Sequence, residues 1–469
     1  MSFKSKYIGS RAFYSHALTI AVPMILQNLI TNFVSMMDNI MVGSVGTNQM
    51  NGVSIANQLF FVFNITVFGA VSGPGIFGTQ FFGKKDAEGQ RYTVRFRIIE
   101  ALILILLGMG ILLLFGPNLI NLFISKDDNP ADMAATLDYG LQYVSIMVIG
   151  LIPFALGQAY SSVVRECGET KIPMMGSLAA IGINLILDYG LIFGRLGMPQ
   201  MGVRGAAIAT VIAKFAEAAV VIIWAHTHPD RNPYIRGLYR SLHIPADLTK
   251  RIIAKGFPLL INEFLWALGV SVVAQCYSVR GLDVVGARNI SGTMTNLFNV
   301  VYIQMGAAIG IIVGNTLGAG KLEQAKDEAR QLRAFSLFLS IPVMLLMIPI
   351  AFFFPMFYNT SEHIKTMATM LIIIQAFATP LWTYTNACYF VLRSGGKTGI
   401  TFLFDFIYSW VIMIPLAFVL AYFTDVGVYT LVSIVTYSEI IKVIVGFFMV
   451  KSDLWVNNIV DSATSEKEA

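Results

Sequence analysis

Carboxylate and amide side chains inside long apolar stretches are the residues of this chain best placed to do chemistry. Asn184 and Asp188 lie within one such stretch, four positions apart, a spacing that puts both on one face of a helix. A carboxylate inside a bilayer is costly, and this stretch contains no Lys or Arg to offset it,. The pair offers oxygen ligands for Na⁺, or a protonatable group beside a hydrogen-bond partner. A polar pair that joins two packed helices is the alternative, but we favour a cation or proton site.

Two further carboxylates each lie near a proline of an apolar stretch. Asp38 follows Pro23 by fifteen residues, roughly 22 Å along a helix, and it is either an ion-binding group or a carboxylate at the membrane interface. Pro23 removes a helical hydrogen bond and can bend its helix. Glu263 comes five residues after Pro258, among apolar residues. It is either a proton carrier or a neutral, hydrogen-bonded interior carboxyl.

Other charged residues in the apolar stretches are predicted to be structural. Lys214 with Glu217, and Glu439 with Lys442, are three positions apart, so each pair can neutralise itself,. Asp405 could belong to either kind.

Signals for an enzyme are weak. Gly396-Lys397-Thr398 resembles the end of a phosphate-binding loop, but position 391 is Val where the first glycine should be,. The five histidines form no metalloprotease pair,. We expect a protein that is not an enzyme and has no cofactor.

The elements that must position these residues are membrane-spanning helices. The chain is 56% hydrophobic and 13% charged, whereas a soluble domain has roughly 25% charged residues. Its apolar stretches approach the length of about 20 residues that a bilayer requires. We predict twelve spans, near residues 15–38, 53–80, 98–116, 138–163, 172–194, 205–225, 257–278, 294–317, 334–357, 366–391, 399–422 and 428–450.

The distribution of basic residues predicts the orientation of these spans. With the N-terminus in the cytoplasm, the inner segments contain 24 of the 32 Lys and Arg residues and the outer loops contain six. An excess of positive charge marks the cytoplasmic side, so both termini are predicted to be cytoplasmic. The formal charge of +5 is dispersed among loops, which argues against nucleic-acid binding.

The first half of the chain recurs in the second. Pro23, Phe63 and Gly83 each match a residue of the same type 235 positions later. Two repeats of six spans both begin in the cytoplasm, so the predicted fold is all-α integral membrane, with twelve transmembrane helices in two six-helix bundles related by a pseudo-two-fold axis along the membrane normal. The predicted domains are an N-terminal bundle, a cytoplasmic linker loop, a C-terminal bundle and a polar cytoplasmic tail, at residues 1–225, 226–255, 256–452 and 453–469.

Several motifs together resemble the multidrug and toxic compound extrusion (MATE) family. They are Pro23-Met-Ile-Leu-Gln27, Asp38-Asn-Ile-Met-Val-Gly43, Asn184-Leu-Ile-Leu-Asp188 and Gly202-Val-Arg-Gly-Ala-Ala-Ile-Ala-Thr210. The resemblance covers essentially all twelve spans. It implies a multi-pass protein of the bacterial plasma (inner) membrane, expected to be a monomer, that exports cationic or amphipathic organic compounds in exchange for Na⁺ or H⁺.

The resemblance also implies roles for individual residues. Asp38, Asn184, Asp188 and Thr210 map onto the family's cation site, and the first three would be the metal ligands if the ion is Na⁺. Pro23 matches a proline whose bending is proposed to accompany ion binding, and Glu263 matches a second, C-terminal site.

The match at that second site is incomplete, because the tenth predicted span, near residues 366–391, contains no Asp or Glu to complete it.

The alternative function is a flippase for a lipid-linked precursor, or an exporter of a single endogenous metabolite.

Overall fold

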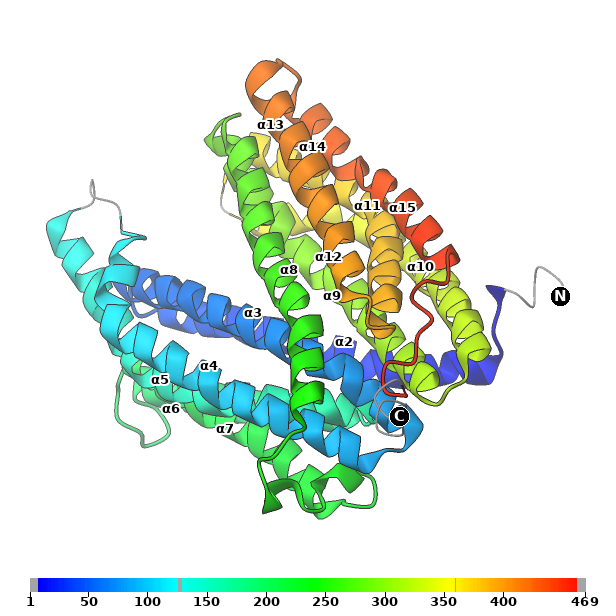
Figure 1. The fold of residues 1–469 in the computed structure, drawn as a ribbon. Coiled ribbons are helices and arrows are strands. Elements are labelled where there is room, and N and C mark those ends of the chain that lie inside the picture. Colours follow the sequence, from blue (N-terminus) through cyan, green and yellow to red (C-terminus); the bar gives the residue numbers. More distant parts are fainter. Residues whose placement is uncertain (1–6, 125–128, 359, 462–469) are drawn as a thin grey trace. The chain divides into compact units, whose positions relative to one another are not determined.

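The computed structural model describes residues 7–124, 129–358 and 360–461, and these ranges are predominantly helical and contain no β-strand (Figure 1). Twelve helical segments there are long and apolar enough to cross a membrane, which confirms the predicted number of spans. The elements are α2 (Arg11–Gly43), α3 (Thr47–Lys84), α4 (Ala87–Asn121), α5 (Pro130–Glu166), α6 (Lys171–Phe193), α7 (Val203–Thr227), η1 (Pro233–Ile235), η2 (Leu238–Arg240), α8 (Ala246–Ser278), α9 (Leu282–Gly318), α10 (Leu322–Phe353), η3 (Phe354–Phe357), α11 (Glu362–Ser394), α12 (Thr398–Phe406), η4 (Ile407–Met413), α13 (Ile414–Phe423), α14 (Val428–Tyr437) and α15 (Glu439–Lys451).

Most helices are longer than the apolar stretches that predict them. The span expected at 334–357 begins at Leu322, and its added turns contain Glu, Gln, Lys, Ala and Arg, all good helix formers. Side chains cap several of the extended ends. Asp86, for example, accepts a hydrogen bond from the Gly89 backbone N–H at the start of α4 (2.8 Å),. Hydropathy therefore locates each span, and helix propensity and capping decide where it ends.

The described chain forms two compact units. The N-terminal unit comprises residues 26–78 and 86–250, except for 125–128, and the C-terminal unit comprises 7–25, 79–85 and 251–461, except for 359. Helices α2 and α3 thus contribute residues to both units. The domain boundaries predicted from the repeat stay a prediction.

Within the N-terminal unit, α4, α5, α6 and α7 run side by side (Figure 1). Small residues let the helices approach closely. A Cβ atom on Gly157 of α5, for example, would lie 3.3 Å from that of Ala218 on α7. Residues 228–245, within the predicted linker loop, pack on α4. Their Tyr234 and Leu238 are buried, and Arg95 donates to the backbone carbonyl of Leu238 (2.9 Å).

Within the C-terminal unit, α9, α10 and α15 all pack against α11. The first part of α2 joins this core through Ala17, Ile20 and Met24. Residues 452–461 also pack there. Trp455 is buried, and the Ile459 backbone N–H donates to the side chain of Gln80 at the end of α3 (2.8 Å).

Candidate cation site

Asp188 and Asn184 share one face of α6 and are buried inside the N-terminal unit, with exposed fractions of 0% and 3%. Both carboxylate oxygens of Asp188 and the amide oxygen of Asn184 are buried without a hydrogen-bond partner in the structure. The two side chains lie close enough to interact, but no hydrogen bond with good geometry joins them. Buried polar oxygens are almost always satisfied in proteins, so these three indicate a site that receives a ligand or a proton.

Asp38 of α2 completes the arrangement. Its carboxyl group lies close enough to that of Asp188 for direct interaction, and its Oδ1 atom is buried without a partner. Two carboxylates at such range repel each other unless a cation or a shared proton lies between them. The structure therefore brings together three of the predicted site residues, although Asp38 precedes Asn184 and Asp188 by 146 and 150 positions in the sequence,.

Thr210 of α7, the fourth predicted residue, lies near the same group. Its hydroxyl is within reach of the phenol of Tyr143, and that phenol is close to both Asp38 and Asp188. Tyr143 lies on α5 and is 4% exposed. It was not among the sequence candidates, because a tyrosine in an apolar span carries no signal that separates it from core packing.

The donor set suits a small hard cation or a proton. Carboxylate, amide and hydroxyl oxygens converge from four helices, and oxygen is the ligand that hard cations prefer. Asp38, Asn184 and Asp188 would hold Na⁺, and its positive charge would offset the two carboxylates. A proton on either carboxyl would instead give one an O–H to donate to the other.

Lys214 lies one helical turn beyond Thr210 on α7. It forms the predicted ion pair with Glu217 (3.0 Å), but its charge also acts on Asp38. Glu217 in turn accepts a hydrogen bond from Ser177 (2.6 Å), and Ser177 accepts one from Gln27 (2.9 Å). An ion pair and two hydrogen bonds thus connect polar side chains of α7, α6 and α2, starting from the lysine whose charge acts on Asp38.

The remaining predicted residues lie elsewhere. Pro23 is buried within α2, which continues through it as a helix. Glu263 lies in α8 of the C-terminal unit and interacts electrostatically with Arg393 and Asp405. Asp405 is in an ion pair with Lys442 (2.6 Å), a shorter contact than the predicted pair of Lys442 with Glu439 (3.9 Å).

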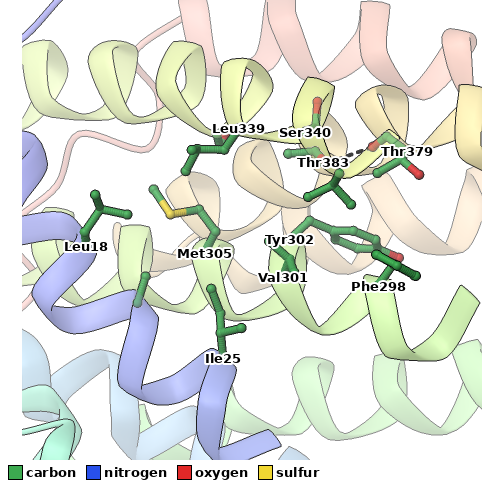
Figure 2. Close-up of a pocket in the computed structure, with 13 residues that line it drawn as sticks. Leu18, Ile25, Phe298, Val301, Tyr302, Met305, Leu339, Ser340, Thr379 and Thr383 are labelled. Atoms are coloured by element: carbon green, nitrogen blue, oxygen red, sulfur yellow. Dashed lines mark hydrogen bonds between the residues drawn. The ribbon is translucent and has the colours of Figure 1, made fainter. Parts of the chain in front are cut away.

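A small pocket lies within the C-terminal unit, between α2, α9, α10 and α11 (Figure 2). Its wall combines aliphatic side chains with Phe298, Tyr302 and Met305, and with hydroxyls such as Thr379 and Thr383. Aromatic and thioether groups suit varied apolar and cationic ligands.

Membrane-spanning helices around buried carboxylates define a polytopic membrane protein of the transporter class. The family model named MatE matches residues 23–190 and 258–419, well over half of the chain. The chain therefore belongs to the MATE family of multidrug transporters, as the sequence motifs predict. This is a family of transporters and not of enzymes.

Individual relatives agree with this assignment. The probable multidrug resistance protein NorM of Thermotoga maritima is 25% identical over 418 residues, which cover 87% of this chain and 86% of that protein. The multidrug resistance protein MdtK of Edwardsiella ictaluri is 23% identical over 411 residues, with 86% and 87% covered. A solved outward-facing multidrug resistance MATE transporter of the MOP superfamily has the same fold, with a TM-score of 0.83 at 16% identity over 97% of this chain and 99% of that one.

Proposed function

We propose that the chain is a secondary active antiporter that exports cationic or amphipathic organic compounds in exchange for inward Na⁺ or H⁺. The observation that carries the proposal is the pair of carboxylates, Asp38 and Asp188, in which Oδ1 of Asp38 and both oxygens of Asp188 are buried without a hydrogen-bond partner. In a transporter, such a pair provides a place where a coupling ion binds and leaves. The multidrug resistance names of the relatives support the substrate class.

The mechanism follows from charge. With the site open to the outside, two ionised carboxylates accept Na⁺ or H⁺, which removes their mutual repulsion and lets α2 move against α5 and α6. Antiport requires that ion and drug favour opposite states of the protein, because each then drives release of the other. Pro23 provides a point in α2 with one helical hydrogen bond fewer, where such a movement costs least.

The charge distribution supports the orientation. We place both termini in the cytoplasm of a bacterial cell, because four times as many basic residues fall on that side,. In this orientation the Asp38 ends of α2 and the Asp188 ends of α6 both lie toward the outside, where an inward ion gradient delivers the ion.

Drug efflux tests the proposal. Cells or vesicles with wild-type protein should export ethidium when a Na⁺ or pH gradient is imposed, and lose export when that gradient is dissipated. Asp38→Asn and Asp188→Asn should remove gradient-driven export while the protein still inserts. Asp138→Asn is the matched control, because Asp138 is an exposed residue of α5 that bonds to Gln142 alone among the described contacts.

Wild-type export by both site variants would refute the assignment. Imposing Na⁺ and pH gradients separately identifies the coupling ion. Failure to export any organic cation, with export of one metabolite or lipid-linked precursor, would favour the alternative function.

A further inference from the structure

Lys442 of α15 is a buried cation held between carboxylates inside the C-terminal unit. Its Nζ atom lies 2.6 Å from Oδ1 of Asp405 on α12 and 3.9 Å from Oε1 of Glu439. The three side chains are only 14%, 15% and 8% exposed. A buried ammonium is stable only when close partners replace its hydration, and here two carboxylates do so.

The groups around the ammonium form a built site. Asn262 of α8 donates to the other oxygen of Asp405 (2.9 Å), and Thr385 of α11 donates to Glu439 (2.9 Å). The ring centroids of Phe404 and Tyr408 lie 5.1 and 5.4 Å from Nζ, within cation–π range. Carboxylates and aromatic rings from α12, η4 and α15 thus surround the ammonium, and donors from α8 and α11 hold the two carboxylates in place.

The internal repeat places an equivalent lysine in the N-terminal unit. In the later part of each repeat the spacing is 228 positions, as between Arg165 and Arg393. At this spacing Lys214 matches Lys442, and Ser177 matches Asp405. Gln27 and Asn262, each four residues after the repeated proline, are 235 apart. Gln27 donates to Ser177 as Asn262 donates to Asp405.

The two units differ in where their carboxylates lie. In the N-terminal unit the lysine pairs with Glu217 on its own helix, and the Asp38–Asp188 pair keeps buried oxygens without hydrogen-bond partners. In the C-terminal unit the position matching Asp38 is Val273, and the position matching Asp188 is Leu416. Another carboxylate of this unit, Glu263, interacts electrostatically with both Arg393 and Asp405.

We propose that Lys442 is a tethered cation that occupies an acidic cation site in the C-terminal unit, so that this unit binds no exchangeable ion. A tethered group competes at a high effective concentration that a free ion cannot match, and it cannot leave the site. This inference rests on the proposed antiport, and under it ion exchange is confined to Asp38 and Asp188 in the N-terminal unit.

Sodium binding to the purified full-length protein tests the proposal. Saturable ²²Na⁺ binding and the melting temperature in NaCl against choline chloride are measured at mildly alkaline pH. Asp38→Asn, which removes the N-terminal site, is the parent. Adding Lys442→Met should create saturable Na⁺ binding and a Na⁺-dependent rise in melting temperature, because Asp405 and Glu439 then lack their cation. Lys442→Arg should leave the parent unchanged, and adding Asp405→Asn to the Lys442→Met variant should abolish the gain.

Two results would overturn the proposal. One is a folded, monodisperse Asp38→Asn/Lys442→Met protein that shows no response to Na⁺. The other is saturable Na⁺ binding in the Asp38→Asn parent that Asp405→Asn removes, because the C-terminal site would then exchange ions with Lys442 in place. Lys442→Gln, which keeps a donor to Asp405 without the charge, gives the same comparison if the methionine variant aggregates. Failure of the antiport proposal would appear separately, as absent ethidium export by the wild type, and would not alter the gain of Na⁺ binding.

Discussion

Replacing Gly83 or Gly318 with alanine is expected to destabilise the C-terminal unit, because the ends of α3 and α9 cross there with their backbones in contact. A Cβ atom on Gly83 would lie 1.9 Å from the carbonyl oxygen of Asn315, and one on Gly318 would lie 2.0 Å from that of Gln80. These four residues form two pairs related by the 235-residue repeat. The crossing is therefore reciprocal.

The size of the effect follows from these distances. Ordinary van der Waals contact begins near 3.4 Å, so each substitution requires a separation of 1.5 or 1.4 Å at the crossing. Overpacking a well-packed site costs about 1–3 kcal/mol, and a backbone carbonyl cannot turn away as a side-chain end can. We therefore take the upper value, and subtract the gain of about 1 kcal/mol that alanine brings to a helix. Each single variant should lose roughly 2 kcal/mol.

Thermal unfolding in detergent, followed by the fraction of protein that elutes as a monodisperse peak, measures this loss. Gly110→Ala in α4 is the control, because a Cβ atom there would have no neighbour within 4 Å. The double variant should lose less than the sum of the singles, since helices already separated by one methyl group leave room for the other. If the Gly83→Ala and Gly318→Ala variants have the same melting temperature as the Gly110→Ala variant, the backbones do not approach as closely as the structure shows.

Three further predictions concern polar groups of the N-terminal unit. Arg97→Met or Glu166→Gln should each lower the free energy of unfolding by about 3–5 kcal/mol, because each breaks a buried ion pair of 2.6 Å. Replacing both residues with apolar ones should lose less than the sum of the two single losses, and a loss equal to that sum would contradict this. Tyr143→Phe should raise the half-saturating concentration of the coupling ion roughly fivefold, which corresponds to the loss of one hydrogen bond of about 1 kcal/mol. Unchanged ion dependence would exclude the phenol from the site. Arg95→Met should speed tryptic cleavage between α7 and α8, because Arg95 holds three backbone carbonyls of that segment. Glu169→Gln, which breaks the ion pair with Arg231 and keeps every tryptic site, should not.

The number of spans and the central pair of the site could be predicted because both depend on local sequence. Apolar stretches identify membrane helices by length and composition, and a spacing of four places Asn184 and Asp188 on one face whatever the tertiary structure. The approach of Asp38 to that face is not a local property. The family resemblance supplied it, and the geometry of α2 and α6 agrees with it.

Partners from distant helices could not be predicted. Glu263 has no basic residue three or four positions away in the sequence, whereas the structure brings Arg393 of α11 close enough to interact with it. Lys442 likewise has a local partner by spacing, but the carboxylate nearest to it comes from α12. Arg97 and Glu166 lie just outside the predicted spans, yet they form a buried pair, because α4 and α5 continue as helices past their apolar stretches.

The two repeats keep glycine at matching positions of the backbone crossing, but they place their charged groups at different positions. At the crossing of α3 and α9, each helix end meets the backbone of the other, so a side chain on either one would separate both, and glycine is required at the two matching positions. An ion pair restricts the positions of its residues less, because a carboxylate needs only to come within reach of its lysine. It can therefore lie on the lysine's own helix as Glu217 does, or on the preceding span as Asp405 does. Under the proposed antiport and the proposed role of Lys442, that freedom lets one unit keep an acidic pair for an exchangeable ion while the other holds its cation covalently, within a single duplicated fold.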